Sequence, residues 1–266
     1  MRKGGAILYC DCAYTELAPA SAKARVREGL TAGGLAYTQV ADLCELAARR
    51  DGRLAGWAAE PRLQIIACYP RAARWLFSAG GAPLRKDARI WNLRTQGAEE
   101  IVAGVREACG GDGAAGGQGG KEGAAETIAS AGGWTPWFPA IDYDRCVGCK
   151  TCYGFCLFGV YALEGEGRVT VANPAACKTN CPACARVCPQ AAIIFPKYAA
   201  APINGGEGSA AEAGRDEGVL KAAGEAAQAL EGEEAVGVDL RGLLKGDVYA
   251  TLRRRGMREH RTRPPA

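Results

Sequence analysis

Eight of the thirteen cysteines in this 266-residue chain lie in two short runs, and their spacing constrains the fold more than any other feature. The first run, residues 146–156, reads CVGCKTCYGFC, and the second, residues 177–189, reads CKTNCPACARVCP. The spacing is C-x2-C-x2-C-x3-C in the first run and C-x3-C-x2-C-x3-C-P in the second. Cysteines that are clustered and repeated in this way indicate metal ligands rather than scattered buried thiols.

Composition and charge indicate the redox state of these cysteines, the cellular location of the protein and the partners that it can bind. An odd number of cysteines excludes a framework in which every one is paired in a disulfide. Met1-Arg2-Lys3 is followed by an apolar run too short for a secretory signal, because Asp11 interrupts it. No stretch approaches the roughly 20 apolar residues of a membrane helix. We therefore expect a cytoplasmic protein with reduced thiols and no membrane insertion. The net charge of +4 is too small to favour nucleic acid.

Residues 141–195 resemble the bacterial ferredoxins that carry two [4Fe–4S] clusters. The resemblance implies that the fourth cysteine of each run begins a helix and serves the cluster of the other run. One cluster would then be held by Cys146, Cys149, Cys152 and Cys188, and the second by Cys177, Cys181, Cys184 and Cys156. Two features depart from the family pattern: one extra residue between Cys177 and Cys181, and Leu157 in place of a proline. The alternatives are two structural zinc sites or buried cysteines, neither of which requires crossed ligands.

Low-complexity segments predict how the chain is divided. Residues 110–133 and 199–234 are rich in glycine and alanine, which favours flexible linkers. The ordered units would be an α/β domain at 1–109 and an α+β ferredoxin-like domain at 134–198, moving independently. Residues 235–266 form a short basic tail with apolar residues at helical spacing, which indicates either a docking segment or a solvated end.

Strand and helix signals alternate in the first unit. Short apolar runs at 5–9, 35–41, 63–68 and 88–93 predict strands, and patterns at 20–32, 42–59, 71–79 and 97–109 predict helices. Strand–helix alternation is typical of a parallel sheet covered by helices. In such a sheet the carboxyl ends of all strands meet at one edge, where open α/β sheets bind ligands.

Four further cysteines follow three of these strands: Cys10, Cys12, Cys44 and Cys68. We expect them to converge at the carboxyl edge of the sheet and Cys109 to lie away from them. Cys10 and Cys12 can both face the site only if the chain turns between them, with Asp11 pointing to solvent. Arg71 and Arg74, near Cys68, favour a thiolate there. Three interpretations stay open: a third cluster or other metal site, a redox-active thiol site, or inert packing of small apolar residues.

Residues 5–83 also resemble the amino-terminal domain of the A subunit of heterodisulfide reductases. The shared pattern is a cysteine pair after the first strand, then LC, then AC-x-P-R before a helix. The resemblance implies flavin-linked electron transfer and an iron–sulfur centre in this domain. The flavin-binding part of that subunit has no counterpart, because no G-x-G-x-x-G motif follows the first strand.

Together these features predict an electron-transfer protein, or an oxidoreductase subunit, that passes electrons through two [4Fe–4S] clusters to or from a redox partner protein. Four thiolates leave a cluster no open position for substrate, so we expect no catalytic residue in the ferredoxin-like segment. The alternative is a redox enzyme that uses the N-terminal thiols and draws electrons from the ferredoxin-like domain.

Overall fold

Five parallel strands form the sheet that the strand–helix alternation predicts. The computed structural model describes residues 6–13, 17–110 and 125–213. Within them the sheet has the order β4-β3-β1-β2-β5. Its strands are β1 (Ile7–Cys10), β2 (Tyr37–Val40), β3 (Gln64–Ala67), β4 (Arg89–Asn92) and β5 (Ala125–Ile128). Every neighbouring pair is parallel, so all the carboxyl ends lie at the same edge.

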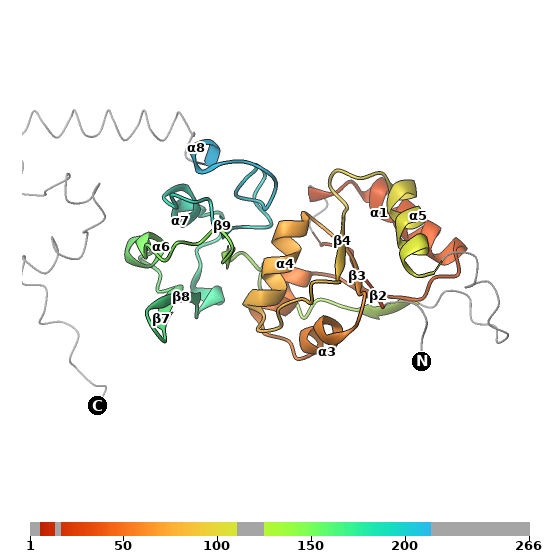
Figure 1. Cartoon of the computed structure of the whole chain (residues 1–266), viewed down its shortest axis with the longest axis horizontal. Coiled ribbons are helices and arrows are strands. Elements are labelled where there is room, and N and C mark those ends of the chain that lie inside the picture. Colours follow the sequence, from red (N-terminus) through yellow and green to blue (C-terminus); the bar gives the residue numbers. More distant parts are fainter. Residues whose placement is uncertain (1–5, 14–16, 111–124, 214–266) are drawn as a thin grey trace, which may run out of the picture.

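Helices cover both faces of this sheet (Figure 1). Helices α1 (Ala20–Ala32) and α5 (Ala98–Ala108) lie on one face, and α2 (Leu43–Ala48), α3 (Arg53–Ala59) and α4 (Pro70–Ala79) lie on the other. The predicted helix at 42–59 is two helices instead of one. Arg50 adopts a left-handed φ of 49°, and the Asp51 carboxylate accepts the backbone N–H of Arg53, which starts α3.

The fifth strand lies in the segment that composition predicts to be a linker. Residues 125–128 pair with β2 in register, and the backbone N–H of Ala41 donates to the carbonyl of Ile128. The reason is that the outer edge of β2 presents unpaired backbone groups, which a short extended segment can satisfy. Residues 111–124 lie outside the described ranges, so the linker prediction stays open only for them.

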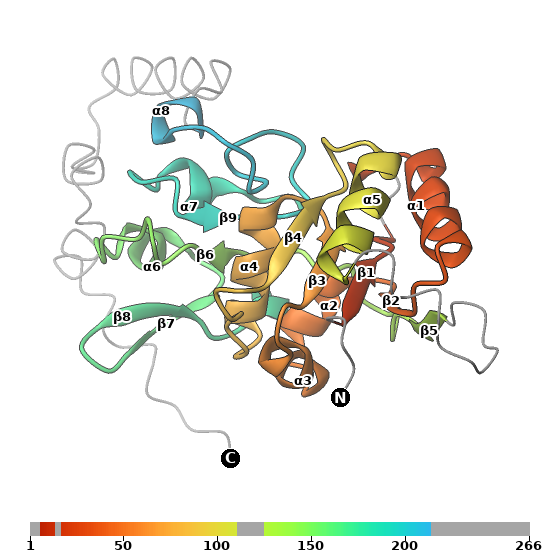
Figure 2. The same ribbon diagram turned by 45° about the vertical axis from the view of Figure 1, so that its right-hand side comes forward.

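Residues 129–213 form small elements beside the sheet domain (Figure 2). Strand β6 (Ala140–Ile141) pairs with β9 (Ile193–Ile194), and β7 (Tyr161–Glu164) pairs with β8 (Arg168–Val171), both antiparallel. Four short helical segments complete this half: α6 (Thr151–Phe155), η3 (Pro174–Ala176), α7 (Ala183–Arg186) and α8 (Ala210–Ala213). None of the helices in the described part of the chain has the length and apolar character that crossing a membrane requires.

The two halves share one apolar core, contrary to the expectation that they move independently. Buried residues of β1, α2 and α4 continue without a break into Trp137, Phe138 and Ile141. Helix α4 lies between the sheet and the cysteine-rich half (Figure 1). Its Arg71 donates from Nε to the buried Asp142 at 2.5 Å and also contacts the Ala191 carbonyl. This buried ion pair favours the packed arrangement of the two halves, because separating them would remove the partner of Arg71 and leave Asp142 with only Arg145 at 3.7 Å.

The described part of the second predicted linker, residues 199–213, also packs against α4. Gly205 has a φ of 92°, and a Cβ there would lie 2.6 Å from the Cβ of Ala72. Only glycine combines this backbone conformation with so close an approach. The rest of that segment and the basic tail, residues 214–266, lie outside the described ranges.

Candidate cysteine sites

Four cysteines from both runs line one cavity in the second half. The cavity has a volume of about 400 Å³, and its thiols belong to Cys156, Cys177, Cys181 and Cys184. The other lining residues are mostly apolar, among them Phe155, Leu157 and Phe158. Cys156 belongs to the first run and lies with three cysteines of the second. This is the grouping expected if the fourth cysteine of each run crosses to the other set.

Two short helices carry cysteines of the two runs. The third cysteine of each run lies within a helix, Cys152 in α6 and Cys184 in α7. Cys156 caps the carboxyl end of α6, so the fourth cysteine ends a helix, whereas the ferredoxin resemblance predicts that it begins one. The extra residue of the second run is absorbed by a turn, because Asn180 adopts a left-handed φ of 61°. Asparagine tolerates this conformation better than most residues.

Three sulfurs of the cysteine runs accept hydrogen bonds, among them Cys149 from the Thr151 hydroxyl at 3.4 Å. The Tyr161 hydroxyl donates to Cys184 Sγ at 3.1 Å, and the Ala192 N–H donates to Cys188 Sγ at 3.3 Å. Burial raises the pKa of Cys184 to about 12, and the Tyr161 hydrogen bond opposes this rise. Donors aimed at sulfur stabilise negative charge on it. Nothing in the sequence pattern singles out Tyr161 for this role.

The remaining four cysteines of the runs differ in exposure. Cys152 and Cys188 are buried, Cys146 is half-buried and Cys149 is exposed. Burial, and then the like charges of Cys184, Cys188 and Cys146, raise the pKa of Cys152 to about 12. Cys152 therefore lies close to Cys184 and Cys188 from the other run and to Cys146 from its own.

The four N-terminal cysteines share a second pocket at the carboxyl edge of the parallel sheet. Cys10, Cys12, Cys44 and Cys68 all line it. The pocket lies where the chain leaves β1 toward one face of the sheet and leaves β3 toward the other. Such a switch point between adjacent strands is where open α/β sheets form a ligand crevice. The expected convergence is therefore present.

A turn at Cys12 lets Cys10 and Cys12 face the same pocket. Cys12 has a left-handed φ of 39°, and Lys23 Nζ donates to the carbonyls of Asp11 and Cys12. The expectation that Asp11 points to solvent is wrong. Its carboxylate accepts from Arg27 at 2.7 Å and from Tyr9 at 3.1 Å, on the face that α1 covers.

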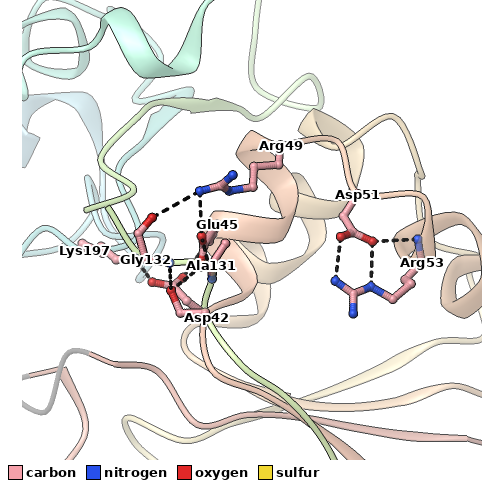
Figure 3. Close-up of polar contacts among 9 residues, drawn as sticks. Asp42, Glu45, Arg49, Asp51, Arg53, Ala131, Gly132 and Lys197 are labelled. Carbon is pink, nitrogen blue, oxygen red and sulfur yellow. Dashed lines mark hydrogen bonds and ion pairs between the residues drawn. The ribbon is translucent and has the colours of Figure 1, made fainter. Parts of the chain in front are cut away.

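Two cations that sequence reasoning missed lie at this pocket. Lys197, which follows β9, pairs with Asp42, and both side chains are at least 96% buried (Figure 3). The other oxygen of Asp42 caps α2 by accepting the N–H of Cys44 at 2.8 Å. Arg94 follows β4, and its buried Nη1 has no hydrogen-bond partner within the described residues. Asp42 and Lys197 are 155 positions apart, so no local pattern links them.

Contacts of Glu45 and Arg49 with the segment after β5 hold α2, and with it Cys44, in place. Glu45, one residue after Cys44, is buried and accepts from the Ser130 hydroxyl at 2.5 Å and the Ala131 N–H at 3.2 Å. Arg49 bridges Glu45 and the Gly132 carbonyl, as Figure 3 shows. The segment after β5 is thereby fastened to α2, which carries Cys44.

Burial has the largest effect on the pKa values of these thiols, and it raises them. It raises the pKa of Cys10 and of Cys44 well above the ordinary value, and that of Cys68 to about 12. The predicted thiolate-favouring effect of Arg71 is wrong, because that guanidinium pairs with Asp142. Cys109 caps the far end of α5, where its charged neighbour is Arg62 just before β3. It lies away from the pocket, as expected.

Within the described ranges, no three cysteine, histidine or acidic side chains surround a single metal ion. The same is true of the four cysteines in the N-terminal pocket and of the two groups of four that the ferredoxin resemblance predicts as cluster ligands. In an iron–sulfur cluster each thiolate binds a different iron, so its ligands stand farther apart than those of one ion.

Comparison with known proteins supports a ferredoxin segment in this chain. An uncharacterized ferredoxin of Methanocaldococcus jannaschii is 49% identical over 61 residues, which are 23% of this chain. The aligned part spans only 41% of that relative. No family model matches the chain, and no solved structure matches it. The similarity to a ferredoxin is thus limited to one segment of this chain.

Proposed function

We propose that this chain is an electron-transfer protein, or a subunit, that carries electrons through two [4Fe–4S] clusters to or from a partner oxidoreductase. The observation that supports it most is the cavity in which Cys156 of the first run joins Cys177, Cys181 and Cys184 of the second. Crossed ligation of this kind distinguishes a two-cluster ferredoxin from two independent zinc loops.

The residues present suit such clusters. Four thiols and no histidine, aspartate or glutamate line the cavity of the second set, and all-thiolate ligation is characteristic of iron–sulfur clusters. When bound, each cluster supplies one-electron chemistry. Around the second set, Val160 and Tyr161 are buried and exclude water. The Tyr161 hydroxyl and the Ala192 N–H place donors on ligand sulfurs, one in each set.

The surface near these sets offers a route to a partner. Exposed large apolar side chains of the described chain all lie between residues 147 and 163: Val147, Tyr153, Phe155, Leu157, Phe158 and Leu163. The patch includes the rim of the cavity that Cys156, Cys177, Cys181 and Cys184 line, and exposed Cys149 of the first run lies within the same stretch. Apolar patches of this kind mark protein contact sites. We propose that a partner oxidoreductase, such as a flavin-linked enzyme, docks here.

The test is to load the full chain with iron and sulfide without oxygen, reduce it and record electron paramagnetic resonance spectra. Cys156→Ala should weaken the cluster of the second run and spare that of the first. The matched control Cys109→Ala removes a thiol outside every set and should change neither signal. Loss of the first-run cluster in the Cys156→Ala variant, or an unreducible wild-type protein, would contradict the proposal.

A further inference from the structure

A cavity without cysteines lies where the two halves meet, and we call it the junction cavity. Its volume is about 260 Å³. The sheet domain contributes Arg50, which follows α2, and Ser78 and Ala79 at the carboxyl end of α4. Residues of β6, β7 and β8 in the cysteine-rich half line the rest. The proposed electron transfer gives this cavity no role.

Two arginines, one from each half, line the junction cavity. Arg168 of β8 lies over the ring of Tyr143, with its guanidinium carbon 3.8 Å from the ring centre. Arg50 donates to the Val171 carbonyl at 3.4 Å. The arginines that pair with carboxylates in the described part of the chain are others: Arg27, Arg49, Arg53, Arg71, Arg85 and Arg145. Each guanidinium of the cavity is therefore held by a neutral group and keeps N–H donors for an anion.

A buried hydroxyl on the same wall lacks a hydrogen bond. Thr170 lines the cavity, and its Oγ1 is shielded from solvent without a partner among the described residues. A buried hydroxyl destabilises the folded chain unless a ligand or a water supplies the missing hydrogen bond. Thr170 lies two positions after Arg168 on β8, so both side chains project from the same face of the hairpin.

The charges around the cavity favour a singly charged anion. Glu164 lies opposite Arg168 in the pairing of β7 with β8 and also lines the cavity. It offsets one of the two guanidinium charges, which disfavours a doubly charged ligand. The last carbonyls of α4 do not compete for the guanidiniums, because those of Leu76, Phe77 and Ser78 accept N–H groups of the residues that follow the helix.

We propose that the junction cavity binds a small organic carboxylate. Its carboxylate group accepts hydrogen bonds from Arg50, Arg168 and Thr170. A short apolar part lies against Ile141 and Val171, which are buried and line the cavity. The volume is below the roughly 300–1,000 Å³ of pockets for drug-sized ligands, so the ligand is small. Because both halves supply donors, the bound carboxylate stabilises their packing.

Calorimetric titration of the full chain with acetate, butanoate and inorganic phosphate, at constant ionic strength, is the test. Butanoate should bind more tightly than acetate, because it reaches the apolar wall, and more tightly than phosphate, because it carries less charge. Arg50→Met and Arg168→Met should each lower the affinity for butanoate about tenfold or more. The matched control Arg53→Met removes the same charge from an arginine that pairs with Asp51 outside the cavity, and should change the affinity less than about twofold.

Thr170→Val replaces the hydroxyl by a methyl group of similar size. It should lower the affinity for butanoate about two- to tenfold, yet leave the thermal midpoint of the ligand-free chain no lower, because the hydroxyl has no hydrogen bond to lose. The absence of saturable binding of both carboxylates would overturn the proposal. Equal weakening by the three arginine substitutions would overturn it in favour of general attraction to a positive surface. Tighter binding of phosphate than of butanoate would overturn the choice of a carboxylate.

Discussion

Removal of the Tyr161 hydroxyl isolates one contact between the protein and a predicted cluster ligand. The hydroxyl donates to Cys184 Sγ at 3.1 Å, and Tyr161 is only 6% exposed. A buried donor of this kind stabilises negative charge on the sulfur more than water would. Since reduction adds one negative charge to the cluster, loss of the donor in Tyr161→Phe should lower its reduction potential.

The size of the shift follows from hydrogen-bond energies. A protein hydrogen bond contributes about 0.5–1.5 kcal/mol net. For a one-electron couple, about 59 mV corresponds to a tenfold change in the equilibrium constant, or about 1.4 kcal/mol. The potential of the second-run cluster should therefore fall by about 20–60 mV. Potentiometric titration followed by electron paramagnetic resonance measures it.

Tyr143→Phe is the matched control, because the Tyr143 hydroxyl donates to the Val169 carbonyl at 2.9 Å and not to sulfur. It should leave the potential of the second-run cluster unchanged. Equal shifts in both variants, or no shift in Tyr161→Phe, would refute the reasoning that the hydrogen bond acts on this sulfur.

Three further predictions concern the packing. Arg71→Met should cost up to about 3–5 kcal/mol of unfolding free energy in a denaturant titration because buried Asp142 keeps only Arg145, at 3.7 Å, as a charged partner, whereas Arg85→Met, at an exposed pair, should leave the unfolding free energy nearly unchanged. Gly205→Ala should lower thermal stability because its Cβ would meet Ala72, and Gly56→Ala, with open space around it, should not. Arg53 lowers the pKa of Asp51 from 3.8 to about 2 through hydrogen bonds. The stability gained is present above about pH 4 and lost as pH falls through 2, so acid unfolding of Asp51→Asn should show less pH dependence there; an unchanged curve would count against this pair.

The sequence predicts most of the sheet domain and the convergence of its thiols. Alternating apolar runs located the first four strands, and the rule that parallel strands end at one edge brought Cys10, Cys12, Cys44 and Cys68 together. Strand β5 was missed because four residues within a glycine- and alanine-rich stretch are too few to show the hydrophobic periodicity of a strand.

Contacts between distant segments account for the other differences. The low-complexity composition of residues 110–133 suggested independent halves, yet pairing of Arg71 with Asp142 and of Lys197 with Asp42 joins them. Ion pairs of this kind join residues that are far apart in the sequence, so the spacing of neighbouring residues does not predict them. The role of Asp11 was mistaken for the same reason, since Arg27, its partner, approaches from a helix in three dimensions.

Reductive titration of the loaded full chain tests the central claim most directly. With two [4Fe–4S] clusters in the cysteine runs, the protein should take up one electron per cluster, reversibly and in one-electron steps. Substitution of all four thiols of the N-terminal pocket by alanine should leave these two electrons unaffected. A chain that binds zinc at the eight run cysteines, or that takes up no electrons reversibly, would contradict the account.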